Sequence, residues 1–124
     1  MQEVIGAIVI QQKEILLTLS DNGVFTPPGG KKKEGETDQQ CLERELDEEL
    51  KTRIEFGDFF TRFETKTPTS KKRVEVACYF VKLLNEPVPS HEISEIRWTA
   101  NPEELKLSDG TRILISRLRA AGRF

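Results

Sequence analysis

The sequence predicts one domain of mixed α/β (α+β) class over residues 1–124, and three observations lead to this fold class. A chain of 124 residues and 14.2 kDa is long enough to bury about two thirds of its unfolded surface in a single core. Short β-branched runs, typical of strands, alternate with two segments that carry helix-capping signals. No repeat, linker or low-complexity tract divides the chain, so we expect a single domain.

Two apolar runs near the start of the chain have the composition of buried strands. Residues 4–10 and 14–19 are rich in β-branched residues and leucine, and the polar tripeptide Gln-Gln-Lys separates them. This arrangement predicts a hairpin of two buried strands. The tetrapeptide Ser-Asp-Asn-Gly at 20–23 then has the composition of a turn.

The first helix is predicted over residues 38–50. Thr37 is followed by Asp-Gln-Gln, which gives the T-x-x-Q capping box of a helix N-terminus and an acid in the first turn, where the helix dipole favours it. Leucines then recur at fourfold spacing, so that one stripe of the helix can face the core: Leu42, Leu46 and Leu50.

The second half of the chain predicts three strands and a closing helix. Alternation and aromatic residues indicate strands over 53–63 and 74–83, separated by the polar loop 64–73. One face of the second of these strands would be formed by Val74, Val76, Cys78 and Phe80. A shorter strand is expected within 92–99. Ser108 then caps a helix whose inward residues are Ile113, Leu114 and Leu118.

Composition and charge exclude several function classes. The formal net charge is −2 with 32% charged residues, which gives no overall sign of a nucleic-acid-binding protein. Cys41 and Cys78 lie far apart without metal-ligand spacing, so we expect reduced thiols in the cytoplasm rather than a zinc site or a disulfide. The N-terminal apolar run of about seven residues is too short for a membrane span, and no membrane partner is expected.

An excess of acidic residues marks the predicted first helix. Placed at 100° per residue, Glu45, Glu48 and Glu49 fall within one arc of about 100° beside the leucine stripe. Like charges at this spacing repel, and only Arg44 and Lys51 lie near enough to compensate them. A hard divalent cation would remove the repulsion and take these oxygens as ligands, whereas the simpler alternative is a solvated acidic face.

Glycines supply the other half of a predicted site. Gly29 and Gly30 allow the backbone to approach a ligand or a metal ion closely. A phosphate-binding P-loop is excluded, because that pattern requires glycine where Phe25 stands and serine or threonine where Lys32 stands.

The order of these residues resembles the Nudix box, G-x5-E-x7-R-E-U-x-E-E-x-G-U, where U is aliphatic. Gly30, Glu36, the triplet 44–46 and the pair 48–49 stand at the specified spacings. The segments Phe-Thr-Pro-Pro-Gly-Gly-Lys at 25–31 and His-Glu-Ile-Ser-Glu-Ile-Arg-Trp-Thr at 91–99 also resemble parts of this family. The resemblance covers nearly the whole chain, which is similar to the small MutT-like Nudix hydrolases.

This resemblance implies a fold and an activity. The fold would be an α/β/α sandwich with a mixed β-sheet between helices. The activity would be cleavage of a nucleoside diphosphate linked to another group X, with Mg²⁺ or Mn²⁺ as the cofactor. The expected partner is a small nucleoside di- or triphosphate substrate, and oxidised dGTP, an ordinary dNTP, ADP-ribose and a nucleotide sugar all stay open. The oligomeric state, a homodimer included, stays open as well.

The resemblance also implies a set of metal ligands. Divalent cations neutralise charge that builds up on phosphate oxygens and lower the pKa of a bound water. The ligands would be the carbonyl of Gly29 and the carboxylates of Glu45, Glu48 and Glu49.

Two further roles follow from the same resemblance. Arg44 would pair with Glu36 or with a glutamate of the helix and orient the site. In some relatives a glutamate of a later loop is a further ligand or the general base. Glu92 is the candidate for that role here, with Glu95 behind it, and Glu49 or metal-bound hydroxide is the alternative base.

Other residues near the predicted site have weaker functional interpretations. Lys31 begins a run of three lysines that could meet substrate phosphates, although such runs usually serve solvation. Phe25 could stack on a base but is equally expected in the core. His91 is the sole histidine, and we interpret it as an exposed loop residue.

The chain departs from the family pattern where the box ends. Lys51-Thr52 stands in place of glycine followed by an aliphatic residue. A non-glycine residue in a left-handed C-cap costs about 1 kcal/mol. The departure therefore concerns the end of the helix rather than the chemistry.

Two other function classes stay open. A Nudix-fold nucleotide-binding regulator that does not hydrolyse its ligand would be expected to lose the metal glutamates, which this chain keeps. An RNA-end pyrophosphohydrolase would be expected to have an extended basic surface, for which residues 65–73 are only a short candidate. Hydrolysis of a small nucleotide is favoured, and binding to nucleic acid is not expected.

Overall fold

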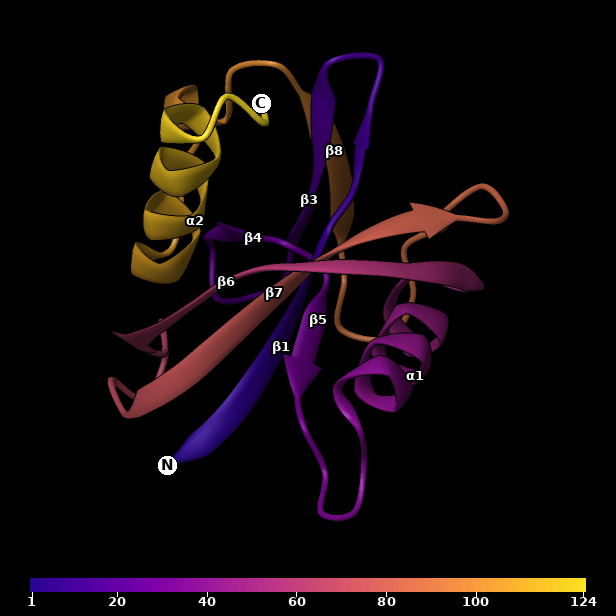
Figure 1. The fold of residues 1–124 in the computed structure, drawn as a ribbon, viewed down its shortest axis with the longest axis vertical. Helices are drawn as coiled ribbons and strands as arrows, with labels where there is room; N and C mark the ends of the chain where they lie inside the picture. Colours follow the sequence, from indigo (N-terminus) through magenta and orange to yellow (C-terminus); the bar gives the residue numbers. More distant parts are fainter.

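The chain folds into two β-sheets and two α-helices in a computed structural model that describes residues 1–124 (Figure 1). In chain order the elements are β1 (Gln2–Ile8), β2 (Ile10–Gln11), β3 (Glu14–Leu19), β4 (Phe25–Thr26), β5 (Gly29–Lys31), α1 (Asp38–Leu50), β6 (Ile54–Lys66), β7 (Arg73–Leu83), β8 (Glu95–Thr99), the 3-10 turn η1 (Pro102–Glu104) and α2 (Asp109–Ala120). Neither helix is long and apolar enough to cross a membrane.

The larger sheet is mixed, with the strand order β5-β1-β7-β6. β1 runs parallel to β7, with Gln2 opposite Val74 and Ile8 opposite Phe80, while the other two pairings are antiparallel. In the second sheet, β3 pairs with β2, β4 and β8, all antiparallel. The predicted α+β fold with a mixed sheet is confirmed. The structure also contains a second sheet, which was not predicted.

The predicted N-terminal hairpin is wrong in its extent. Only Ile10 and Gln11 pair with β3, together with one bond from the Leu16 N–H to the Val9 carbonyl at 2.9 Å. β1 itself belongs to the other sheet, and the chain passes from one sheet to the other at Val9. The physical reason is burial. Both faces of β1 are covered, because Ile5 is 0% exposed and Ile8 is 1% exposed. A strand that is buried on both faces lies in the middle of a sheet, where its backbone N–H and C=O groups are paired with neighbouring strands on both edges.

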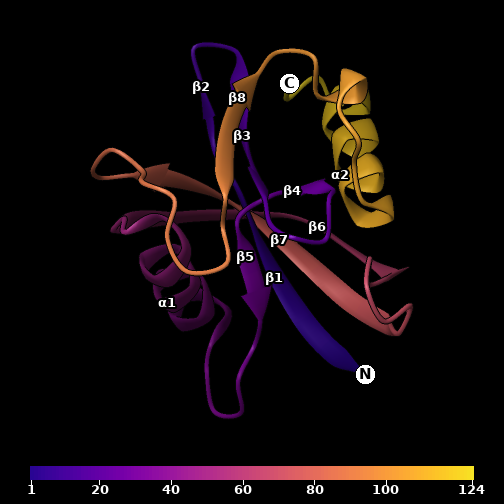
Figure 2. The same ribbon diagram turned by 180° about the vertical axis from the view of Figure 1, so that it is seen from behind.

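The two helices cover opposite faces of the mixed sheet (Figures 1 and 2). The alternation of β1 separates them: Ile5 and Ala7 pack with α1 in one core cluster, while Ile8 packs with α2 in the other. The three leucines of α1 are fully buried, as predicted. The closing helix buries Leu114, Ile115 and Leu118, so Ile115 takes the buried position predicted for Ile113, which is only partly buried.

Local sequence signals explain where α1 begins. The Thr37 side chain accepts a bond from the Gln40 N–H at 3.1 Å, and the Gln40 side chain accepts one from the Thr37 N–H at 3.0 Å. This is the predicted capping box, formed in full. It fixes the first turn of the helix, and so the direction in which the glutamates further along the helix project.

Candidate active site

Three glutamates of α1 lie at the border between the core and solvent. The Glu45 side chain is 13% exposed and the Glu48 side chain 40% exposed. Glu49 is buried, with 6% of the residue exposed. The three acids therefore lie at the edge of the core, as expected from the helical wheel. Their exposure to solvent is greatest at Glu48 and least at Glu49.

Glu49 is a carboxyl group in an unfavourable place for a charge. Burial raises its pKa to about 8, and the negative charges of Glu45, Glu92 and Glu48 act in the same direction. One hydrogen bond opposes this shift: the Gly29 N–H donates to Glu49 Oε1 at 3.1 Å. Burial also raises the pKa of Glu45. Glu45 has a positive partner in Arg44, which opposes the effect of burial on its pKa, whereas Glu49 has none and would gain from one.

The backbone of β5 comes so close to these acids that only glycine fits. A Cβ on Gly30 would lie 2.6 Å from Cδ of Glu45. A Cβ on Gly29 would lie 2.1 Å from the Ile5 carbonyl oxygen, and its φ of +139° disfavours any side chain. The close approach predicted for these glycines is thus present: Gly30 lies close to α1, and Gly29 lies close to β1.

Arg44 links the acids of α1 to the loop that precedes the helix. Its Nε and Nη2 donate to the two carboxylate oxygens of Glu36 at 2.6 and 2.9 Å, and Nη2 also donates to the Lys31 carbonyl at 3.1 Å. Nη1 contacts Glu45 at 2.8 Å and Glu48 at 3.5 Å. The hydrogen bonds from Arg44 lower the pKa of Glu36 to about 2. The predicted partner of Glu36 is therefore present, and it bridges two helix glutamates as well.

The donor set suits a hard divalent cation, although the side chains do not yet enclose one. No group of three or more acidic, histidine or cysteine side chains forms a ready coordination shell, and Arg44 occupies oxygens of Glu45 and Glu48. The fit rests on chemistry: Glu49 is buried with a single hydrogen bond to its carboxylate, and carboxylate oxygens are the ligands that Mg²⁺ and Mn²⁺ prefer. A cation bound here would have to displace the Arg44 contact with Glu45.

Glu92 lies in the segment between β7 and β8, as an exposed residue. Its negative charge adds to the raised pKa of Glu49 and of Glu45, for which burial is the main cause. Glu95, the second candidate, is instead paired with Arg97 at the start of β8. His91 is exposed, and its Nδ1 lies 3.3 Å from Ser90 Oγ. Glu92 is therefore the loop acid whose charge acts on the helix acids.

The end of α1 keeps its regular shape despite the missing glycine. Lys51 has left-handed backbone angles, φ 54° and ψ 40°, and its N–H bonds back to the carbonyls of Asp47 and Leu46. The Thr52 N–H also donates to the Leu46 carbonyl, at 3.3 Å. A lysine thus occupies the position that glycine usually takes, at a cost in backbone strain.

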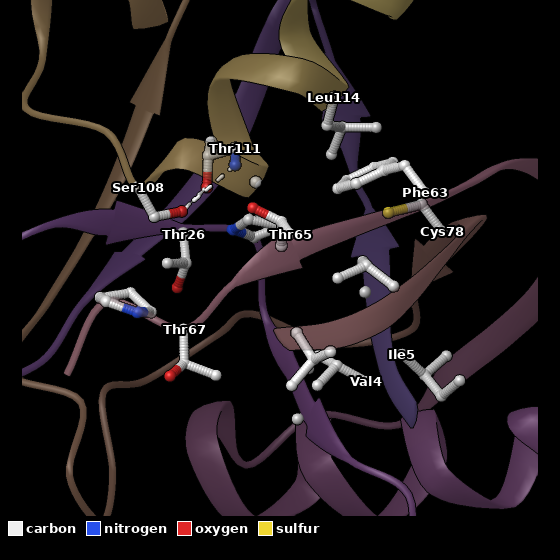
Figure 3. A pocket seen from close by; sticks show the side chains of 18 of the residues that line it. Val4, Ile5, Thr26, Phe63, Thr65, Thr67, Cys78, Ser108, Thr111 and Leu114 are labelled. Carbon is white, nitrogen blue, oxygen red and sulfur yellow. Dashed lines mark hydrogen bonds between the residues drawn. The ribbon is translucent and has the colours of Figure 1, made fainter. Parts of the chain in front are cut away.

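A cavity of about 310 Å³ lies on the side of β5 that faces away from α1. Figure 3 shows threonine side chains gathered along one part of its wall and apolar side chains along the other. The polar part includes Thr26, Thr65, Thr67, Ser108 and Thr111, and the apolar part includes Val4, Ile5, Phe63, Cys78 and Leu114. None of the lining residues is acidic. Sequence reasoning missed this cavity, because its wall is assembled from segments far apart in the chain.

The structure separates the weaker candidates. Lys31 is exposed and belongs to the wall of the cavity. Lys32 is bound to Asp38 at 2.8 Å, and Asp38 also accepts a hydrogen bond from Tyr79. Phe25 is 7% exposed and packs in the core, with the Arg97 guanidinium 5.2 Å from its ring centre. Of the three lysines at 31–33, Lys31 is thus the one that lines the cavity.

Comparison with known proteins identifies related folds and a family model. The model of the NUDIX domain matches residues 1–118. The Escherichia coli ORF135 protein is similar in structure, with 26% identity, a TM-score of 0.78, and coverage of 97% of this chain and 91% of that one. The MutT protein of Methanosarcina mazei has 19% identity, a TM-score of 0.85, and coverage of 99% and 96%.

A third structure, a MutT NUDIX hydrolase from Burkholderia pseudomallei, has 20% identity, a TM-score of 0.83, and coverage of 94% of this chain and 97% of that one. No curated protein sequence matches.

Proposed function

The chain belongs to the NUDIX domain family, and from this premise we propose that it is a Mg²⁺- or Mn²⁺-dependent pyrophosphohydrolase of a small nucleotide. The substrate would be a nucleoside triphosphate or a nucleoside diphosphate linked to another group. The family assignment carries the reaction class, and the arrangement around β5 supports the kind of substrate.

One observation carries the proposal: the two glycines of β5 belong to both halves of the site. On one side the Gly29 N–H bonds to Glu49, and Gly30 lies against Glu45. On the other side both glycines, with Lys31, form part of the wall of the cavity. A nucleotide whose base occupies the cavity would therefore have its phosphates close to the acids of α1.

The cavity has the chemistry of a base site. It is apolar along one part and lined with hydroxyl groups along the other, which suits a flat heterocycle with a few polar edges. Its lack of acidic side chains avoids repulsion of the phosphates, and Lys31 at its wall supplies a positive charge.

The acids of α1 would hold the cation, with the carboxylates of Glu45, Glu48 and Glu49 and the carbonyl of Gly29 as its ligands. A bound cation supplies neutralisation of phosphate charge and a water of lowered pKa. Arg44 holds the loop before α1 through Glu36 and would orient the site. Glu92 is the candidate to accept a proton from the attacking water, with Glu49 as the alternative.

Solved structures of similar fold leave the substrate open. They include an ADP-ribose pyrophosphatase from Streptococcus suis, at 21% identity and a TM-score of 0.75, besides the MutT proteins. We propose the cytoplasm as the compartment, where both cysteines would stay the free thiols that they are in the structure. The kept glutamates favour hydrolysis over binding without turnover.

A substrate panel tests the proposal. Deoxynucleoside triphosphates, oxidised dGTP, ADP-ribose and nucleotide sugars are incubated with Mg²⁺, and pyrophosphate or phosphate release is measured, with chelator and the Glu48→Gln variant as controls. We expect cation-dependent release from at least one substrate, abolished by chelator and lowered about 100-fold or more by Glu48→Gln. Absence of turnover on the whole panel, or turnover that the Glu48→Gln change leaves nearly unaltered, would contradict the proposed function.

A further inference from the structure

The segment 84–94, between β7 and β8, is docked on the C-terminal end of α1. The Ser90 N–H donates to the Glu49 carbonyl at 2.9 Å, and the Val88 N–H donates to the Leu50 carbonyl at 2.9 Å. Figure 2 shows this segment running alongside α1 before it turns up into β8. The same segment carries Glu92, so the last turn of the acidic helix and the loop acid are joined through the backbone.

This docking solves a problem at the helix end. The last four carbonyls of a helix lack partners within the helix. Here the left-handed Lys51 turns the chain so that the carbonyls of Leu46 and Asp47 are satisfied locally. The carbonyls of Glu49 and Leu50 are satisfied by the docked segment instead. The loop is therefore part of the helix cap, and its position is tied to that of Glu49.

The side chain of Asn85 connects the docked segment to the residues that follow α1. Its Nδ2 donates to the Lys51 carbonyl at 2.9 Å, and its Oδ1 accepts from the Arg53 N–H at 2.9 Å. The Leu84 N–H adds a bond to the Arg53 carbonyl at 2.9 Å. An amide carries its donor and its acceptor on separate atoms, so the Asn85 side chain makes both bonds at once, whereas an aspartate would keep only the bond from the Arg53 N–H.

The far end of the segment is also fixed. The Ile93 N–H closes a turn on the Ser90 carbonyl at 3.1 Å, and Ile93 itself is 8% exposed. The Ser94 N–H then donates to the Leu19 carbonyl of β3 at 2.8 Å. Glu92 thus lies in a short turn anchored on α1 at Ser90 and on β3 at Ser94.

We propose that Asn85 is a positioning residue for the reaction: it fastens the segment 84–94 to the end of α1 and so keeps Glu92 beside Glu49. This inference rests on the proposed function, since Glu92 needs a fixed place only if it acts on the cation or on the attacking water. The electrostatic effect of Glu92 on Glu45 and Glu49 agrees with this placement. The simpler alternative is that Asn85 only stabilises the helix end.

A double-mutant cycle separates these two roles. The kcat and KM values are measured for the wild type, Asn85→Ala, Glu92→Gln and the double variant, on the best substrate of the panel. Positioning partners of catalytic metal sites contribute about 10- to 100-fold, so we expect Asn85→Ala to lower kcat by about tenfold or more with KM nearly unchanged. In the Glu92→Gln background the same change should have no further effect on kcat.

Two readouts do not depend on turnover. Hydrogen exchange of the Val88 and Ser90 amides, measured without cation, should be faster in Asn85→Ala, and affinity for Mn²⁺ alone should stay close to that of the wild type, because Glu92 is outside the proposed ligand set. Asn85→Asp keeps the acceptor for the Arg53 N–H and removes the donor to the Lys51 carbonyl, so it replaces Asn85→Ala if that variant fails to fold. Asn101→Ala is the matched control, because the Asn101 side chain caps nothing.

The outcomes decide between the alternatives. Equal losses of kcat in both backgrounds would show a general structural role and overturn the inference, as would unchanged amide exchange or a silent Glu92→Gln change. If the wild type neither binds Mn²⁺ nor hydrolyses any substrate, the proposed function fails and this inference falls with it. If the wild type and Glu48→Gln behave as proposed while Asn85→Ala equals the wild type, only the positioning role is lost.

Discussion

Glutamates occur in two contrasting settings in this molecule. On the β6–β7 ladder two glutamates each have an arginine of their own: Glu75 contacts Arg62 at 2.8 Å and Glu64 contacts Arg73 at 2.7 Å, with every partner at least 36% exposed. On α1, Glu45 and Glu48 share Arg44 with the loop acid Glu36, while the buried Glu49 has no basic partner.

The difference indicates a separate use for each set of acids. Paired, exposed acids cost little to fold and contribute little to stability. Crowded acids at the edge of the core are costly unless a positive partner arrives, and a fold keeps such an arrangement when function requires it. The ladder is therefore a structural use of glutamate, and the acidic edge of α1 is the candidate for a functional one.

The largest expected effect is on turnover. Glu48→Gln and Glu49→Gln each remove a charge without changing volume, so kcat should fall by about 10² to 10⁴-fold or more while the fold persists. Glu75→Gln makes the same chemical change on the ladder and should leave kcat unaltered, with a stability change below about 1 kcal/mol. Steady-state kinetics measure kcat, and circular dichroism checks the fold. Similar losses of kcat in the α1 variants and in Glu75→Gln would show that the acids of α1 have no special role in turnover.

The next prediction concerns pH. Burial raises the pKa of Glu49 from 4.5 to about 8, so the folded protein holds a proton that the unfolded chain has released across this window. Stability without cation should therefore fall as pH rises from about 4.5 to about 8 and level off above. Glu49→Gln cannot ionise and should flatten most of this fall. Urea titrations in chelator at a series of pH values measure the free energy of unfolding. If this free energy depends on pH in the variant as it does in the wild type, Glu49 ionises normally.

A smaller effect should come from the Arg44 bridge. Because Glu36 and Arg44 position the loop as a unit, the double change of Glu36→Gln with Arg44→Ala should lower kcat/KM less than the two single losses combined. A matching cycle on Glu64 and Arg73 of the ladder should show no effect on kcat/KM. Strictly additive losses at Glu36 and Arg44 would mean that each acts alone.

The smallest expected effect is at the end of α1. Lys51→Gly removes the strain of a left-handed lysine, so it should raise the free energy of unfolding by about 1 kcal/mol with turnover nearly unchanged. Chemical denaturation and kinetics on the same sample measure both quantities. A clear loss of activity at equal stability would assign Lys51 a part in the site and contradict a purely structural role for it.

Local signals in the sequence predicted the parts of the site that lie on one element. Thr37 and Gln40 show where α1 begins, the leucine spacing shows which face it buries, and the glutamates follow from both. Lys51 in a glycine position indicated the left-handed helix end that the structure contains. These features depend on neighbours within a few residues, which a sequence pattern can report.

Features that join distant segments were beyond such reasoning. The apolar run at 4–10 has the composition of a hairpin strand, and nothing local shows that β1 pairs in parallel with β7, some 70 positions away. The cavity brings Thr26, Thr65 and Ser108 together only after both sheets have formed. The contact of Asn85 with Lys51 is likewise set by the path of a loop, for which no periodic signal exists.

The central claim is that the acidic edge of α1 binds a divalent cation, and thermal unfolding tests it most directly. The melting temperatures of the wild type, Glu48→Gln, Glu49→Gln and Glu75→Gln are compared in chelator and in Mg²⁺ or Mn²⁺. A cation at 100 times its Kd should stabilise the wild type and Glu75→Gln by about 2.7 kcal/mol, and the two α1 variants much less. Equal stabilisation of all four proteins, or none in any of them, would contradict the claim and leave these acids without a part in cation binding.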